Sequence, residues 1–154
     1  MPALPVVIDE EAGLVTRFAA LLRCEQAELK AGNASALPEL TQQKSALIDE
    51  INAAANRRNL LLAEAGFALD KAGMAAWFNE HPGEQKTRQT WEKMLVVARD
   101  IQELNRLNGQ LVSIHLSATQ EALSTLTEQA RRSTLYGPNG QTAPLTGHRI
   151  IDSA

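Results

Sequence analysis

The stretch Trp91–Val112, WEKMLVVARDIQELNRLNGQLV, decides the fold, because its apolar residues recur with the period of an α-helix. They form one seam, which comprises Trp91, Met94, Leu95, Ala98, Ile101, Leu104, Leu107, Leu111 and Val112. The helical pattern continues on both sides and predicts one long helix over residues 86–132, about 70 Å in length at ~1.5 Å per residue. Gly109 interrupts this helix and favours a bend or a close contact there.

Two shorter amphipathic helices precede the long one. The first follows a lead-in of residues 1–8 and is expected to begin at Asp9, whose side chain can cap a first turn rich in carboxylates. It ends near Gly32, and the second helix runs from a few residues later to about Gly66, with Pro38 in its first turn. The short connection predicts an antiparallel helical hairpin.

Residues 67–85 are less regular. They predict a brief helix from about Met74 to Phe78, which a break at Pro82 separates from the long helix. Trp77 and Phe78 are expected to fold back and cover one end of the bundle.

The predicted fold is all-α, an antiparallel helical hairpin plus one long C-terminal helix in a coiled-coil-like three-helix bundle. Residues 1–132 form this bundle domain. From residue 133 onward glycine, proline, threonine and polar residues predominate, and residues 133–154 are predicted to be a flexible C-terminal tail.

Composition narrows the classes of function. The net charge of −3 and the scattered basic residues argue against nucleic acid or an anionic membrane as a partner. No apolar run approaches the ~20 residues of a membrane span, and the N-terminus lacks the features of a secretory signal. The single cysteine, Cys24, is compatible with a reducing compartment. We therefore expect a cytoplasmic protein.

No catalytic or metal-binding pattern is visible. His81, His115 and His148 lie far apart and fit no zinc spacing, and Cys24 borders an apolar stripe, where a partly buried, inert thiol is expected. The carboxylates lie mostly away from the stripes and predict a solvated surface; they are Glu10, Glu11, Asp49, Glu50, Glu64, Glu92, Asp100, Glu103 and Glu128. We predict no enzyme, no metal and no cofactor.

The distal part of the long helix carries more apolar surface than the hairpin can cover. A second helix of about 30 residues reaches only to about Ile114 of an antiparallel neighbour. Two adjacent apolar stripes span about 200° of the helix, whereas one packed face needs about 100°. The first stripe comprises Leu104, Leu107, Leu111, Ile114, Ala118 and Ala122. The second stripe comprises Val112, Leu116, Leu123, Leu126 and Ala130. Three alternatives for what covers this apolar surface stay open: another protein, a second copy of this chain, or the first helix of the same chain.

Several short motifs stand out along the chain. NRLNGQLV contains an Asn-Gly within the last long helix, at Asn108 and Gly109. TLYGPNGQT contains an L-Y-G-x-x-G element in the tail, at Leu135, Tyr136, Gly137, Gly140 and Gln141. The hairpin contains E-Q…L at Glu25, Gln26 and Leu29, and K-S-x-L at Lys44, Ser45 and Leu47. Together these motifs resemble those of the FlgN family of flagellar export chaperones, and the resemblance covers about residues 14–151.

The resemblance implies a cytoplasmic chaperone of flagellar type III export. Such chaperones bind the C-terminal helical segments of hook–filament junction (hook-associated) proteins, prevent their premature assembly and deliver them to the export gate. The family's cargo surface maps here onto Leu111, Val112, Leu116, Leu123 and Leu126. Contact with the export gate maps onto Leu135, Tyr136, Gly137 and Gly140. The alternative is a structural coiled-coil protein that self-associates through the distal part of the long helix, and a homodimer of the cargo-free chain is also open.

Overall fold

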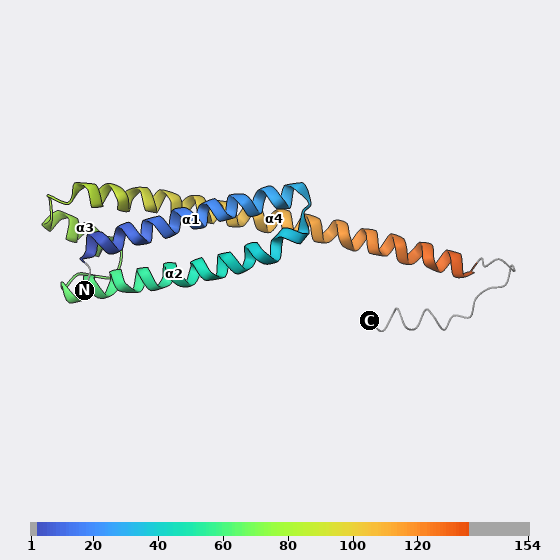
Figure 1. Cartoon of the computed structure of the whole chain (residues 1–154), viewed down its shortest axis with the longest axis horizontal. Helices are drawn as coiled ribbons and strands as arrows, with labels where there is room; N and C mark the ends of the chain where they lie inside the picture. Colours follow the sequence, from blue (N-terminus) through green and yellow to red (C-terminus); the bar gives the residue numbers. More distant parts are fainter. Residues whose placement is uncertain (1–2, 136–154) are drawn as a thin grey trace. The chain divides into compact units, whose positions relative to one another are not determined.

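The computed structural model describes residues 3–135, and throughout that part the regular structure is helical (Figure 1). Its elements are α1 (Leu4–Ala31), the short 3₁₀ helix η1 (Ala34–Ala36), α2 (Leu37–Glu64), α3 (Lys71–Glu80) and α4 (Gln85–Leu135). The predicted all-α class is confirmed. The tail predicted to be flexible lies outside the described residues from position 136 onward.

The chain divides into two compact units, residues 1–111 and residues 112–154. The division falls within α4, so that the first half of this helix belongs to the first unit. Among the described residues, every buried apolar side chain belongs to the first unit. The predicted boundary between bundle and tail at residues 132–133 stays a prediction, although α4 itself continues to Leu135.

Helix α1 begins at Leu4, so the predicted start at Asp9 and the predicted irregular lead-in are wrong. Pro5 lies in the first turn, where its missing N–H costs no helical hydrogen bond. Val7 and Ile8 are fully buried, while Asp9 is exposed. Burial of this apolar turn in the core therefore stabilises a helical start that the prolines seemed to exclude.

Helices α1 and α2 lie side by side and antiparallel, as predicted (Figure 1). Gly32 ends α1 with φ of 71°, a left-handed conformation that favours glycine, and α2 follows after η1 with Pro38 in its first turn. The hairpin packs through a buried cluster of Phe18, Leu21, Leu22 and Leu47. Partly buried Leu104 of α4 packs against the same cluster.

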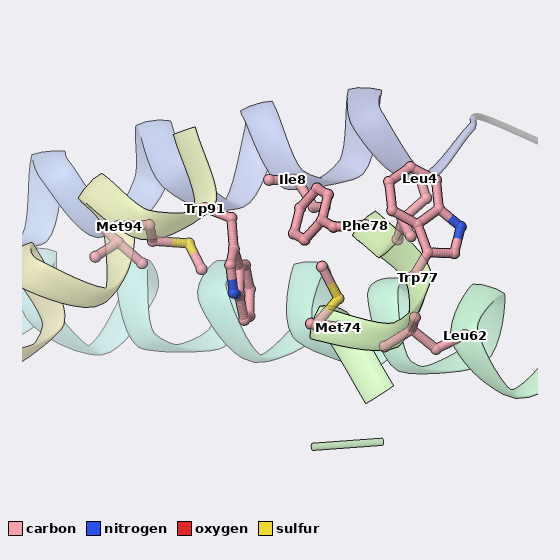
Figure 2. Close-up of a cluster of buried hydrophobic side chains, with 9 residues drawn as sticks. Leu4, Ile8, Leu62, Met74, Trp77, Phe78, Trp91 and Met94 are labelled. Atoms are coloured by element: carbon pink, nitrogen blue, oxygen red, sulfur yellow. The ribbon is translucent and has the colours of Figure 1, made fainter. Parts of the chain in front are cut away.

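Helix α3 closes one end of the first unit, as predicted for Trp77 and Phe78. The two rings meet edge to face, with centroids 5.2 Å apart, and both are buried. Figure 2 shows them beside side chains from the other helices; the buried cluster is Leu4, Ile8, Val15, Leu62, Met74, Trp77, Phe78, Trp91 and Met94. Asp70 caps the helix by accepting a hydrogen bond from the Gly73 N–H. A Cβ at Gly73 would lie 1.7 Å from the Ala68 carbonyl oxygen, so this turn requires glycine.

Candidate functional site

Arg58 of α2 connects three helices within the first unit. Its guanidinium donates to both carboxylate oxygens of Glu11 on α1, at 2.7 and 3.0 Å, and lies 4.9 Å from the ring centroid of Trp91 on α4. Glu11 is only 4% exposed. The prediction that Glu11 belongs to a solvated surface is therefore wrong, because Arg58 neutralises the carboxylate and satisfies its oxygens inside the bundle.

A second group, here called the polar cluster, comprises buried Glu25 of α1, buried Asn108 of α4 and partly buried Lys44 of α2. The Lys44 ammonium donates to both oxygens of Glu25, at 3.2 and 3.0 Å. The Asn108 side-chain amide donates to the Leu22 carbonyl at 2.9 Å and to Glu25 Oε1 at 3.0 Å. The three residues belong to three motifs that the sequence showed separately, and folding brings them together.

Gly109 does not have the predicted close contact. It is exposed, and nothing lies within 4 Å of the position that a Cβ would occupy. Its neighbour Asn108 is the buried member of the Asn-Gly pair, at 3% exposure. The structural constraint on this motif therefore acts on the asparagine.

The predicted cargo surface is exposed over most of its length. Val112, Leu116, Leu123 and Leu126 are 49, 57, 59 and 61% exposed, and Leu111, in the first unit, is half-buried. At ~100° per residue the four exposed side chains lie within about 80° of one another around the helix, and we call them the leucine face. Such a contiguous apolar surface is typical of a site that binds another helix.

Thr119 lies within the leucine face, beside Leu116 and Leu123. Its hydroxyl donates to the His115 carbonyl at 2.9 Å. Because this hydroxyl is satisfied within the helix, covering Thr119 has a low desolvation cost.

The opposite side of the same segment is mostly polar, although Ile114 also lies on it and is 63% exposed. A shallow depression there is lined by Ser117, Gln120, Glu121, Ser124 and Thr125. Serine, glutamine and glutamate side chains remain hydrated at little cost, so this side is suited to solvent. The distal half of α4 is therefore amphipathic, with its apolar side exposed.

The exposed carboxylates of α4 behave as predicted for a solvated surface. Glu103 accepts two hydrogen bonds from Arg106, at 3.0 and 2.6 Å, and both side chains are more than half exposed. The Arg106 hydrogen bond lowers the pKa of Glu103, and the same contact raises the pKa of Arg106. Screening by water leaves such a pair little effect on stability.

Groups capable of chemistry are dispersed. Within residues 3–135 no three His, Cys, Asp or Glu side chains gather in a way that could hold a metal ion. His81 stacks on Trp77 with ring centres 4.1 Å apart and donates from Nδ1 to the Trp77 carbonyl at 2.7 Å, which is a packing role. Cys24 is exposed, so its predicted partial burial is wrong; the neighbouring Leu22 and Glu25 face the bundle instead. His148 lies outside the described residues.

None of the helices in the described part has an apolar stretch long enough to cross a bilayer. The side chains predicted to contact the export gate lie outside the described part of the chain. Leu135 is the last residue of α4, and its side chain, together with Tyr136, Gly137 and Gly140, lies outside what the structure describes.

The chain is similar to known proteins along nearly its whole length. The model of the FlgN protein family matches residues 1–144. The flagella synthesis protein FlgN of Proteus mirabilis is 26% identical over 154 residues, which cover 97% of this chain and 98% of the relative. The flagella synthesis protein FlgN of Escherichia coli K12 is also 26% identical, over 151 residues that cover 97% of this chain and 95% of the relative.

A solved structure has the same fold. It is the crystal structure of a flagella synthesis protein FlgN from Pseudomonas aeruginosa, which superposes with a TM-score of 0.65 at 22% sequence identity. The match covers 82% of this chain and 99% of the other.

Proposed function

The chain belongs to the FlgN family and has a role in flagellar assembly, and we propose that it fulfils this role as a cytoplasmic chaperone of type III export. Its cargo would be the C-terminal helical segments of hook-associated junction proteins. The chaperone prevents their premature assembly and delivers them to the export gate. The role is one of binding and is not enzymatic.

The observation that carries this proposal is the exposed leucine face of α4. Its four side chains are each about half to two-thirds exposed, and they line one side of a helix whose other side is mostly polar. An amphipathic cargo helix would lay its own apolar side against Val112, Leu116, Leu123 and Leu126. The segment that drives polymerisation of the cargo would then be hidden without nucleotide or covalent chemistry.

The size of the face is compatible with release. Fully burying one leucine-sized side chain stabilises a complex by about 1.5–3 kcal/mol. Four such side chains, already partly shielded in the free helix, must also offset the loss of translational freedom and the ordering of the cargo, which together cost at least about 4 kcal/mol. The expected affinity is therefore moderate, and the cargo can be transferred at the export gate.

Light scattering coupled to gel filtration separates this proposal from the alternative of a self-associating structural protein. We expect the chain to form an equimolar complex with a synthetic C-terminal helix of a junction protein. A tight dimer that buries residues 111–130 and ignores the peptide would refute the chaperone proposal and favour the structural one.

Tyr136→Ala is expected to leave cargo affinity unchanged while weakening docking at the export gate by about tenfold, or about 1.4 kcal/mol. The reason is that the L-Y-G-x-x-G element follows the leucine face in sequence and contains a tyrosine, a residue type that often dominates binding energy. Calorimetry with the cargo peptide and with the purified cytoplasmic gate domain measures both affinities. Equal loss of both would instead make Tyr136 part of the cargo site.

A further inference from the structure

Between Ile101 and Leu111, the seam by which α4 packs on the hairpin has one deeply buried polar position. Partly buried Ile101, Leu104 and Leu111 repeat along it at helical spacing, and Asn108 lies between them at 3% exposure. A polar residue at such a position lowers stability relative to a leucine, since its amide must be desolvated. Its presence therefore needs a reason other than stability.

Burial of Asn108 leaves one of its two side-chain polar atoms without a hydrogen bond. The amide nitrogen donates to the Leu22 carbonyl and to Glu25, whereas the side-chain oxygen is buried without a partner among the described residues. Buried polar atoms without partners are uncommon in folded proteins. A leucine at this position would bury no unpaired polar atom. Asparagine therefore lowers the stability of the fold relative to leucine, while its amide nitrogen makes two specific hydrogen bonds.

Register is the property that Asn108 can determine and that its apolar neighbours cannot. If α4 slid along the hairpin by one turn, leucines and isoleucines of the seam would largely replace one another. The same slip would move Asn108 by about 5.4 Å, far beyond hydrogen-bond reach of both the Leu22 carbonyl and Glu25. Only one register satisfies its amide.

We infer that Asn108 is a positioning residue that sets the register of α4 against the hairpin through the polar cluster. Lys44 assists because it holds both oxygens of Glu25 at 3.2 and 3.0 Å, which fixes the acceptor that Asn108 needs. A single buried asparagine has this role in helical coiled coils, at a cost in stability. The inference concerns the first unit and holds whichever partner binds the distal half of α4.

Distance measurements between two spin labels test the register directly. One label is placed on native Cys24, which is exposed near the polar cluster, and the other on Gln89→Cys, an exposed position of α4. Electron double resonance should give one narrow distance for this reference chain. In Asn108→Leu we expect a second population, displaced by about 5 Å for a slip of one turn, and a melting temperature equal to or above that of the reference. A merely structural role would change the melting temperature without producing a second distance.

The matched control is Asn105→Leu, which makes the same substitution at an exposed position of the same helix and should keep the single distance. A single, unchanged distance in Asn108→Leu would overturn the inference. If that variant does not fold, the chain with leucine substituted for all of Glu25, Lys44 and Asn108 gives the answer: two distances support the inference and one distance refutes it. Loss of helix in both variants would also refute it, because the polar cluster would then be required for folding itself.

Discussion

On the proposed function, we expect replacement of Leu123 and Leu126 by aspartate to lower the affinity for the junction-protein C-terminal helix by at least about 100-fold, which corresponds to about 2.7 kcal/mol. Both side chains are about 60% exposed in the free chain and belong to the leucine face. Against a cargo helix, each aspartate would lose hydration without gaining a partner, and the apolar contact would be lost as well. Isothermal titration calorimetry with the cargo peptide measures the change.

Helix content should persist in this double variant, because neither leucine has a buried packing contact to lose. The matched control is Ser117→Asp with Ser124→Asp, which adds the same charge to the polar side of the same segment. That control should bind within about threefold of the wild type, since surface substitutions away from a contact change free energies by about 0.5 kcal/mol. Equal losses in the two double variants would show that net charge, and not the leucine face, governs binding.

The number and order of the main helices could be predicted from periodicity, because burial of one side of a helix leaves a local pattern. The start of α1 could not. Pro5 looked like an interruption, and only the tertiary burial of Ile8 against α3 shows that the helix already exists at Leu4. A local pattern contains no information about which distant residues will cover it.

The buried polar contacts between helices were missed for a related reason. Glu11 and Arg58 are 47 positions apart, and Glu25 and Asn108 are 83 positions apart. Each carboxylate taken alone is typical of a solvated helix side, and its burial depends on a partner supplied by another helix. The motif resemblance did single out Glu25, Lys44 and Asn108, but it could not show that they touch. The exposure of the leucine face, by contrast, could be predicted from the sequence, because the helix lengths show that the hairpin is too short to cover the distal part of the long helix.

Arg58→Ala destabilises the chain by about 3–5 kcal/mol, the range found when one partner of a buried ion pair is removed. The substitution leaves the Glu11 carboxylate, 4% exposed, without the two hydrogen bonds at 2.7 and 3.0 Å that neutralise it. It also removes the cation from the ring of Trp91, so the contacts from α2 to α1 and to α4 weaken together. Urea unfolding followed by circular dichroism gives the free energy of unfolding.

The neighbouring Arg57→Ala is the control, because Arg57 also pairs with a carboxylate of α1 but in water. Its contact with Glu10 is 3.1 Å long, and both side chains are 49% exposed. Loss of such an exposed pair should cost no more than about 1 kcal/mol. Replacing both Glu11 and Arg58 by leucine should restore most of the stability lost in Arg58→Ala, since no buried charge then remains unpaired. If the double leucine variant is as unstable as Arg58→Ala, packing of the arginine side chain, and not the unpaired carboxylate, accounts for the loss.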